Sequence, residues 1–382
     1  MVAGISIAEL DNLYPGRIGV QQRLLPVYRV EFFERLAGAC SGGLSLFAGE
    51  PGLGEALVTT QTLNQASFAF AHNWHLGRVD SQYYLLWQKG IKAWLAHWQP
   101  DALILEANPR YLASRQAIRW MHARQRPVIG WGLGAPPFGS KGMFTAFQRR
   151  FRQGFLLSFD ALIVYSQRGF EEYRSLGFPD DKIYIARNAV KGRPKELYKE
   201  RSLNPGSTPT ILFVGRLQGR KRIDNLIRAC SNLPVDIQPD VWIVGDGPAR
   251  ADFERLAQEI YPRARFFGTL HGPQLAAKFN QADLFVLPGT GGLAVQEAMA
   301  FGLPVIVAEG DGTQDDLVRP ENGWQVAPDD LSELQNAIYA ALANPDRLRK
   351  MGRESFRIVS QEINVETMVS VFVEALNNTK VA

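Results

Sequence analysis

Short, continuously apolar runs alternate with longer amphipathic stretches along the chain. Runs without polar alternation are typical of strands buried on both faces, as in a parallel sheet. Helix-period stretches such as residues 224–230 and 331–343 separate the runs. This alternation predicts a doubly wound α/β domain. In the C-terminal half the apolar runs are residues 211–215, 241–245, 283–288 and 304–308.

The N-terminal half repeats the pattern, with IGVQQ, LSLFAG, ALILEA, PVIGWG and ALIVYS as the expected strands. Between the halves, the polar residues 191–209 contain three prolines and two glycines, which indicates a linker. We therefore expect two Rossmann-like domains facing across a cleft, over residues 1–195 and 206–360. Ligands of such folds bind at the carboxyl ends of the strands.

The length of 382 residues agrees with two domains of this size. The net charge of +4 is unevenly distributed, because residues 1–195 hold 23 Lys and Arg against 14 Asp and Glu. The remaining residues hold 19 against 24. This asymmetry predicts that the first half meets something anionic: nucleic acid, a membrane surface or a phosphate-bearing acceptor. The basic residues are scattered, which argues against nucleic acid.

The sequence favours a cytoplasmic location. No apolar run reaches the ~18–20 residues that span a bilayer, and the first residues lack the basic region of a secretory signal. Cys40 and Cys230 lie in separate halves without metal-ligand spacing, so we expect free, buried thiols. The five histidines show no metal spacing either, and no metal site is expected.

Two segments of the C-terminal half could bind a diphosphate. Arg216 ends a predicted strand and Lys221 follows five residues later, where two cations could converge on phosphate. A solvated basic turn is the alternative. The glycine-rich residues 289–292 precede a predicted helix over 293–301, and the backbone amides of such a turn can bind an anion. Glu297, one turn into this helix, could accept the hydroxyls of a ribose or simply be solvated.

These segments also carry a resemblance to a known family. GRLQGRK, VGDGP, FFGTL, ADLFVLP, EAMAFGLPVIV and ENGWQV follow one another over residues 208–345. In order and spacing they resemble the C-terminal domain of family 4 retaining glycosyltransferases of the GT-B fold. The resemblance implies a bacterial-type enzyme that moves a hexose from a UDP-, GDP- or dTDP-sugar to a polysaccharide, glycolipid or small-molecule acceptor. It implies a nucleotide-sugar co-substrate and no metal or other cofactor.

The resemblance also implies the donor site. Arg216 and Lys221 would act catalytically by holding the diphosphate, Glu297 would bind the ribose, and residues 267–270 would lie near the base. The complete expected donor set is Gly215, Arg216, Lys221, Gly245, Phe267, Gly268, Leu270, Gly289, Thr290, Gly291, Gly292, Leu293 and Glu297.

The sequence departs from the family pattern at two positions. Gly289 stands where the family usually has the first of two glutamates, which contacts the transferred sugar. A branch of the family with a GG-L-x-x-x-E pattern is similar, so we do not interpret this loss as inactivation. Leu133 stands where related enzymes often have a histidine. Both absences leave open a non-catalytic partner subunit, against which Arg216, Lys221 and Glu297 argue.

The acceptor side resembles the family more loosely. Residues 21–37 resemble the first strand, acceptor loop and helix of bacterial polysaccharide glycosyltransferases. Glu106 ends a predicted strand and is the candidate general base of the catalytic set. Asn108 follows it, either in the site or as a helix cap. The expected acceptor-binding residues are Arg23, Tyr28, Arg29, Glu106, Asn108, Arg110, Trp131 and Leu133.

Three helices complete the prediction. Residues 142–159 place Phe144, Phe147, Phe151 and Phe155 on one stripe, with Arg149, Arg150 and Arg152 largely elsewhere. This helix lies either on the anionic inner face of a membrane or against its own domain. Residues 83–98 are expected to form a core helix. By the resemblance, the C-terminal helix within residues 363–382 completes the N-terminal domain.

Other functions fit less well. A dehydrogenase would carry G-x-G-x-x-G after the first strand of a domain, and neither half does. A nucleic-acid-binding module would show a basic stripe with interleaved aromatic residues, so we expect no nucleic-acid partner. The expected partners are a nucleotide-sugar donor, a glycan or lipid-linked acceptor and an anionic membrane surface.

Overall fold

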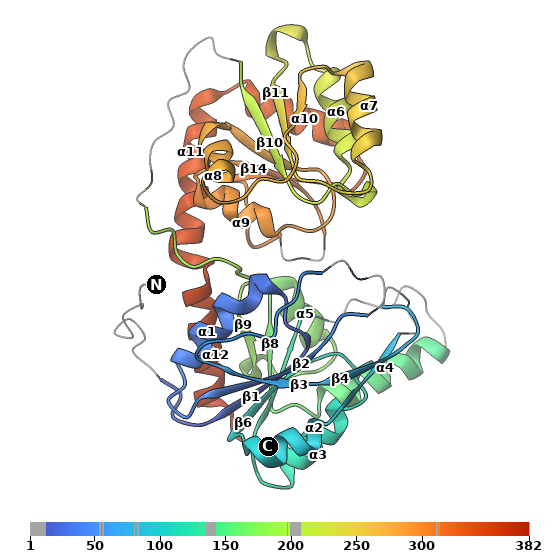
Figure 1. The fold of residues 1–382 in the computed structure, drawn as a ribbon, viewed down its shortest axis with the longest axis vertical. Coiled ribbons are helices and arrows are strands. Elements are labelled where there is room, and N and C mark those ends of the chain that lie inside the picture. The colour runs from blue at the N-terminus through green and yellow to red at the C-terminus, as the bar shows by residue number, and fades with distance from the viewer. Residues whose placement is uncertain are drawn as a thin grey trace. The chain divides into compact units, whose positions relative to one another are not determined.

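The computed structural model describes residues 13–52, 55, 57–79, 81, 84–134, 143–196, 198, 208–310, 312 and 314–381, with the backbone alone for 143–148. The chain forms two compact units (Figure 1). Unit 1 comprises Met1–Gly192 with Val365–Ala382, and unit 2 comprises Arg193–Asn364.

Unit 1 is built on a parallel sheet in the order β3-β2-β1-β6-β7-β8-β9. The five apolar runs of the N-terminal half form β1, β2, β6, β7 and β8. The chain moves outward from β1 to β3 and then returns to place β6 on the other side of β1, so the strand order reverses between β1 and β6. The strands are β1 (Ile18–Leu24), β2 (Leu44–Gly49), β3 (Ser67–Phe70), β6 (Ala102–Glu106), β7 (Val128–Gly132), β8 (Ala161–Val164) and β9 (Ile183–Ile185).

Helices cover both faces of this sheet. Val128 of β7 belongs to a hydrophobic cluster shared by α2, α3, α4 and α5, whereas Trp131, three positions on, lies on the opposite face. There α12 packs against α1, β8 and β9 (Figure 1). The Phe372 ring of α12 lies 4.9 Å from both Phe32 of α1 and Trp131. The helices are α1 (Val30–Gly38), α2 (Ile91–Trp98), α3 (Ser114–His122), α4 (Met143–Leu156), α5 (Gln167–Ser175) and α12 (Val365–Asn378).

The expected core helix over residues 83–98 is wrong in its first part. Leu85–Lys89 forms β5, which pairs antiparallel with β4 (His72–Leu76). Gly90 has φ +99, a conformation that L side chains rarely adopt, and α2 begins only after it. The cross-strand pairing and this glycine therefore divide the aromatic stretch into a strand and a helix.

Unit 2 has a parallel sheet in the order β12-β11-β10-β13-β14-β15, which reverses between β10 and β13. Its four predicted runs form β10 (Thr210–Val214), β11 (Asp240–Val244), β13 (Leu284–Leu287) and β14 (Val305–Ala308). The short strands β12 (Ala264–Phe266) and β15 (Gly323–Val326) lie at the edges. The helices are α6 (Ile223–Ser231), α7 (Arg250–Ile260), α8 (Gly272–Gln281), α9 (Leu293–Ala300), α10 (Leu331–Leu342) and α11 (Pro345–Arg357).

The interior of both units agrees with the apolar pattern. Central strands such as β2, β8, β13 and β14 are buried at every position. Cys40 and Cys230 are buried free thiols, and burial raises the pKa of the Cys40 thiol to about 12. Within the described ranges, no helix has the length and apolar character needed to cross a membrane.

Candidate functional site

Two turns meet where the strand order of unit 2 reverses. The first follows β10 and contains a 3-10 helix, Gly219–Lys221; the second follows β13 and contains Thr290. The Lys221 Nζ donates to the Thr290 carbonyl at 2.7 Å, and the Thr290 amide donates to the Arg220 carbonyl at 3.1 Å. The Arg220 guanidinium also donates to the Thr290 hydroxyl at 3.4 Å. These bonds hold the basic turn and the glycine-rich turn together.

Lys221 is a buried cation in this arrangement, with 9% of its surface exposed. Burial, together with the neighbouring Arg220 charge, lowers the pKa of Lys221 to about 8. A buried ammonium loses hydration that a single carbonyl only partly replaces. An anion bound beside Lys221 would compensate that loss. The second predicted cation, Arg216, is exposed at the end of β10.

Glycine is required at several positions of this site. A Cβ atom on Gly289 would overlap the Arg220 carbonyl and lie 2.7 Å from the Lys221 Cα. Gly291 has φ +87, and its Cβ would lie 2.9 Å from the Lys221 Nζ. Gly245 has φ +133 and its Cβ would overlap the Gly215 carbonyl. The close backbone approach at Gly289 explains why no glutamate stands there.

The helix α9 begins directly after the glycine-rich turn. Gly292 is its N-cap residue and has no side chain that could cap the first amides, so these amides could serve an anion. Leu293 is exposed and Glu297 is half-buried. The ribose-binding role of Glu297 stays a prediction.

The segment expected near the base follows β12. The Gly245 amide donates to the Gly268 carbonyl at 2.7 Å, which joins this segment to the end of β11. The Phe267 ring packs against Trp242 with centroids 5.7 Å apart, and the Lys278 Nζ lies 3.6 Å from its centroid. Leu270, three residues after Phe267, is half-buried. Most of the predicted donor residues thus gather at the carboxyl edge of the unit 2 sheet.

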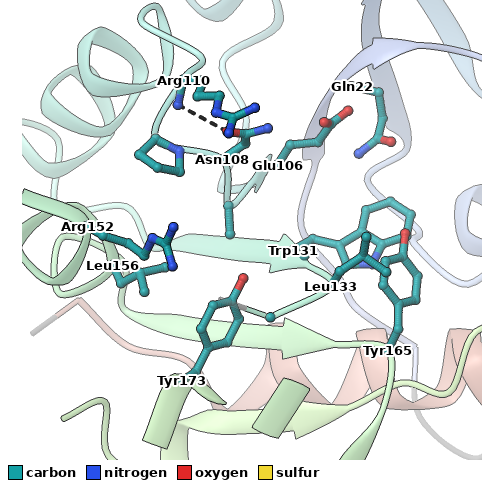
Figure 2. A pocket seen from close by; sticks show the side chains of 14 residues that line it. Gln22, Glu106, Asn108, Arg110, Trp131, Leu133, Arg152, Leu156, Tyr165 and Tyr173 are labelled. Carbon is teal, nitrogen blue, oxygen red and sulfur yellow. Dashed lines mark hydrogen bonds between the residues drawn. The ribbon is translucent and has the colours of Figure 1, made fainter. Parts of the chain in front are cut away.

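Unit 1 has a cavity of about 400 Å³ at the carboxyl ends of β6 and β7 (Figure 2). Five of the eight predicted acceptor residues line it, whereas Arg23, Tyr28 and Arg29 do not. The lining residues missed by the sequence analysis come from β1, β7, α4, α5 and the loops after β6, β7 and β8, and no local motif marks them. The lining comprises Gln22, Glu106, Ala107, Asn108, Pro109, Arg110, Trp131, Gly132, Leu133, Gly134, Arg152, Leu156, Tyr165 and Tyr173.

Glu106 lies where the strand order of unit 1 reverses. Its Oε1 accepts a hydrogen bond from the Arg23 amide at 2.6 Å, and its own amide donates to the Gln21 Oε1 at 3.1 Å. Burial raises the pKa of the Glu106 carboxyl, although the Arg23 amide and charge oppose this effect. The Arg23 guanidinium is held by Glu55 at 2.5 and 2.8 Å. Arg23 therefore positions Glu106 through its backbone.

Arg29 supports the cavity wall from behind. It is buried and donates to the Asn188 Oδ1 at 2.6 Å and the Ala189 carbonyl at 3.1 Å. Its guanidinium lies 5.4 Å from the ring centroid of Tyr165 and 5.8 Å from that of Trp131. These contacts assign Arg29 a packing role in the described structure, while Tyr28 is 40% exposed.

The helix α4 does not present one basic face. Arg149 and Arg150 are exposed, but Arg152 is half-buried and lines the cavity. Phe155 is fully buried, which agrees with packing against unit 1 at this end of the helix, while Phe151 is 49% exposed. The side chains of Phe144 and Phe147 lie outside the described residues.

No cluster of three or more His, Cys, Asp or Glu side chains suited to a metal ion occurs within the described part of the chain.

Comparison with known proteins identifies the C-terminal half. Residues 194–357 match the family of glycosyl transferases group 1. Unit 2 is therefore similar, over most of its length, to the domain that this family model describes. The chain is 33% identical over 167 residues to a sulfoquinovosyl transferase of Arabidopsis thaliana, covering 42% of this chain and 32% of that protein. It is 35% identical over 165 residues to a GDP-mannose-dependent alpha-mannosyltransferase of Mycobacterium tuberculosis, covering 42% of this chain and 40% of that protein. The chain thus spans less than half the length of these curated relatives.

The likeness to solved structures extends beyond residues 194–357. The Anabaena protein HepE, solved in complex with UDP, superposes with a TM-score of 0.68 over 94% of this chain and 99% of that chain. The identity of 15% shows the fold alone. The chain has the GT-B fold, in which both units are Rossmann-like.

Proposed function

We propose that the protein transfers a hexose from a nucleotide-diphosphate sugar to an acceptor hydroxyl, with retention of anomeric configuration. The observation that carries the proposal is the junction of the Lys221 ammonium with the glycine-rich turn of a group 1 glycosyl transferase domain. This junction combines a buried cation, backbone without side chains and a helix N-terminus, which are the groups that a diphosphate requires.

The donor diphosphate would be bound by Lys221, by Arg216 and by the first amides of α9. As the bond between the anomeric carbon and the diphosphate oxygen breaks, negative charge develops on the leaving group. Fixed cations stabilise that charge without reorganisation. Because these groups supply the positive charge, we propose that the transfer needs no metal ion. Glu297 would accept the ribose hydroxyls.

The acceptor would occupy the cavity of unit 1. Its attacking hydroxyl would hydrogen-bond to the carboxyl of Glu106, whose other contacts fix its position. The new bond joins this oxygen to the anomeric carbon, and the proton passes to the leaving diphosphate or to the Glu106 carboxylate. Trp131 and Leu133 would contact the sugar ring.

The acceptor side is also proposed to work at an anionic membrane surface on the cytoplasmic side. Trp74 and Leu76 of β4 are 58% and 53% exposed, and Leu157 after α4 is 51% exposed. Apolar and aromatic side chains on a basic unit suit an interfacial position.

The test is a thermal-shift panel of UDP-, GDP- and dTDP-hexoses followed by NMR of the product. A ligand that binds the folded state alone raises the apparent stability. We expect one nucleotide class to stabilise the protein, Lys221→Ala to abolish the shift, and the product to keep the donor's anomeric configuration. A folded protein that ignores every nucleotide contradicts the proposal and favours a non-catalytic partner subunit.

A further inference from the structure

We propose that the cavity of unit 1 contains a phosphate subsite formed by Arg110, Arg152 and Tyr173, so that the acceptor carries a phosphate group. This inference rests on the proposed function, because it places the acceptor in this cavity. It goes further by stating the acceptor's charge and its orientation.

The two arginines reach the cavity from different elements. Arg110 follows β6, and Arg152 comes from α4. In Figure 2 the Glu106 carboxyl is turned toward Gln22, the Arg152 guanidinium lies at the opposite side of the view, and the Arg110 guanidinium lies beside Asn108. The cavity wall therefore carries two cations as well as a carboxyl.

A bound anion would favour the charged form of Arg152. Arg152 is half-buried, and this burial lowers the pKa of its guanidinium. Nearby Tyr173 and Glu172 raise that pKa, whereas the charge of Arg110 lowers it. Glu172 is itself engaged by the Arg168 guanidinium at 3.3 Å. Arg110 is exposed, but its charge still acts on the half-buried Arg152, and a bound anion would offset that repulsion.

Tyr173 gives an independent indication of a ligand. It is 1% exposed, and its hydroxyl points toward the cavity beside Arg152 (Figure 2). Within the described part of the chain no group accepts the proton of this buried hydroxyl, although the nearby Gly134 amide lowers its pKa against the effect of burial. Burial also raises the pKa of Tyr173, so the hydroxyl keeps its proton and can donate. A buried donor without a partner usually meets one on the ligand.

The hydrogen-bonding groups of Arg110, Arg152 and Tyr173 favour phosphate over a neutral sugar hydroxyl. A guanidinium offers only donors, and its planar fork matches phosphate oxygens. A protonated tyrosine adds another donor, and a phosphate supplies several acceptor oxygens on one atom. The excess of basic residues in 1–195, 23 Lys and Arg against 14 Asp and Glu, would also attract an anionic acceptor. The acceptor is then oriented with its phosphate at Arg110 and Arg152 and its attacking hydroxyl at Glu106.

The phosphate could belong to a soluble sugar phosphate or to a phospholipid headgroup, so the experiment has two arms. The first titrates glucose 6-phosphate and, separately, glucose into the protein by calorimetry. The second measures cosedimentation with vesicles of phosphatidylinositol and phosphatidylcholine against phosphatidylcholine alone. Both arms use the wild type, Arg110→Gln, Arg152→Gln and Tyr173→Phe. Arg150→Gln is the matched control, because Arg150 is an exposed arginine of the same helix.

We expect the phosphate ligand to bind the wild type and the Arg150 variant equally, and at least about tenfold more weakly to each arginine variant. Tyr173→Phe should weaken binding less, since it removes one neutral donor. Binding in the first arm alone identifies a soluble phosphate, and binding in the second alone identifies a headgroup. Binding that is insensitive to Arg110 and Arg152, or absent in both arms, overturns the subsite.

The nucleotide-induced thermal shift is measured on the same samples. Its persistence shows that the variants fold and keeps failure of the subsite distinct from failure of the donor site.

Discussion

The side-chain ammonium of Lys221 donates to the carbonyl of Thr290 across the point where the strand order of unit 2 reverses. In unit 1, the Arg23 amide and the Glu106 carboxylate make the corresponding bond across the reversal between β1 and β6. At such a point the two flanking connections leave the sheet in opposite directions, which leaves a crevice at the strand ends. Both candidate sites therefore occupy equivalent positions in their sheets.

The lowered pKa of Lys221 makes donor binding depend on pH. A bound diphosphate favours the charged ammonium and raises its pKa above the free value of about 8. Affinity for the nucleotide sugar should therefore be full below pH 8, fall as the pH rises through about 8, and be accompanied by proton uptake. Calorimetry in buffers of different ionisation enthalpy measures that uptake. Lys221→Arg remains charged and should lose the pH step; an unchanged step would assign the titration to another group.

Removing either donor-site cation should weaken transfer far more than stability. Charge-assisted hydrogen bonds are worth roughly 1.5–3 kcal/mol, so Arg216→Ala and Lys221→Ala should each reduce kcat/KM by about 10- to 100-fold. The control is Arg228→Ala, an exposed arginine on α6. Steady-state kinetics and thermal melts separate the two effects. Equal activity in all three variants would contradict the proposed diphosphate site.

Gly289 should tolerate no side chain. In Gly289→Ala the new methyl group overlaps the Arg220 carbonyl, so the basic turn must move and we expect a loss of ~1–3 kcal/mol together with loss of donor binding. Gly289→Glu should fail likewise and not gain activity. Gly219 lies in the basic turn that Gly289 contacts, but a Cβ there meets no atom within 4 Å, so Gly219→Ala should be nearly neutral. Denaturant melts and nucleotide shifts measure both; a stable, active Gly289→Glu variant would refute the argument.

Transfer should survive removal of divalent metal ions, because Arg216, Lys221 and the α9 amides are proposed to neutralise the diphosphate. The measurement is product formation in EDTA against a sample with added Mg²⁺ or Mn²⁺. Loss of activity in EDTA that either metal restores would show that these groups are insufficient.

The last helix should be needed for the stability of unit 1. Phe372 is fully buried against Phe32 and Trp131, and deleting a buried aromatic side chain costs about 3–5 kcal/mol. Phe372→Ala should therefore lower the melting transition strongly. Asn377→Ala on the exposed face of α12 should not change it. Equal melting of both variants would show that α12 contributes little to unit 1.

The sequence by itself determined the strand framework and the donor segments. Central strands of a parallel sheet are buried on both faces, so they appear as uninterrupted apolar runs, and nine such runs form strands. The edge strands β3, β9, β12 and β15 were not predicted, because they are short and only partly buried, which weakens the apolar signal. The donor segments were recognised because each follows a strand directly, with its chemistry concentrated in a few consecutive residues.

Only the tertiary structure decided which segments, distant in the sequence, lie in contact with one another. It placed Arg152, which the helical wheel groups with Arg149 and Arg150, in a cavity with Arg110, and it moved Arg29 from the expected acceptor site into the wall behind it. It also showed why position 289 is glycine, because the backbone that excludes a side chain belongs to Arg220, 69 residues earlier. Burial and close approach depend on which elements pack together, and the local periodicity of a sequence carries no record of those partners.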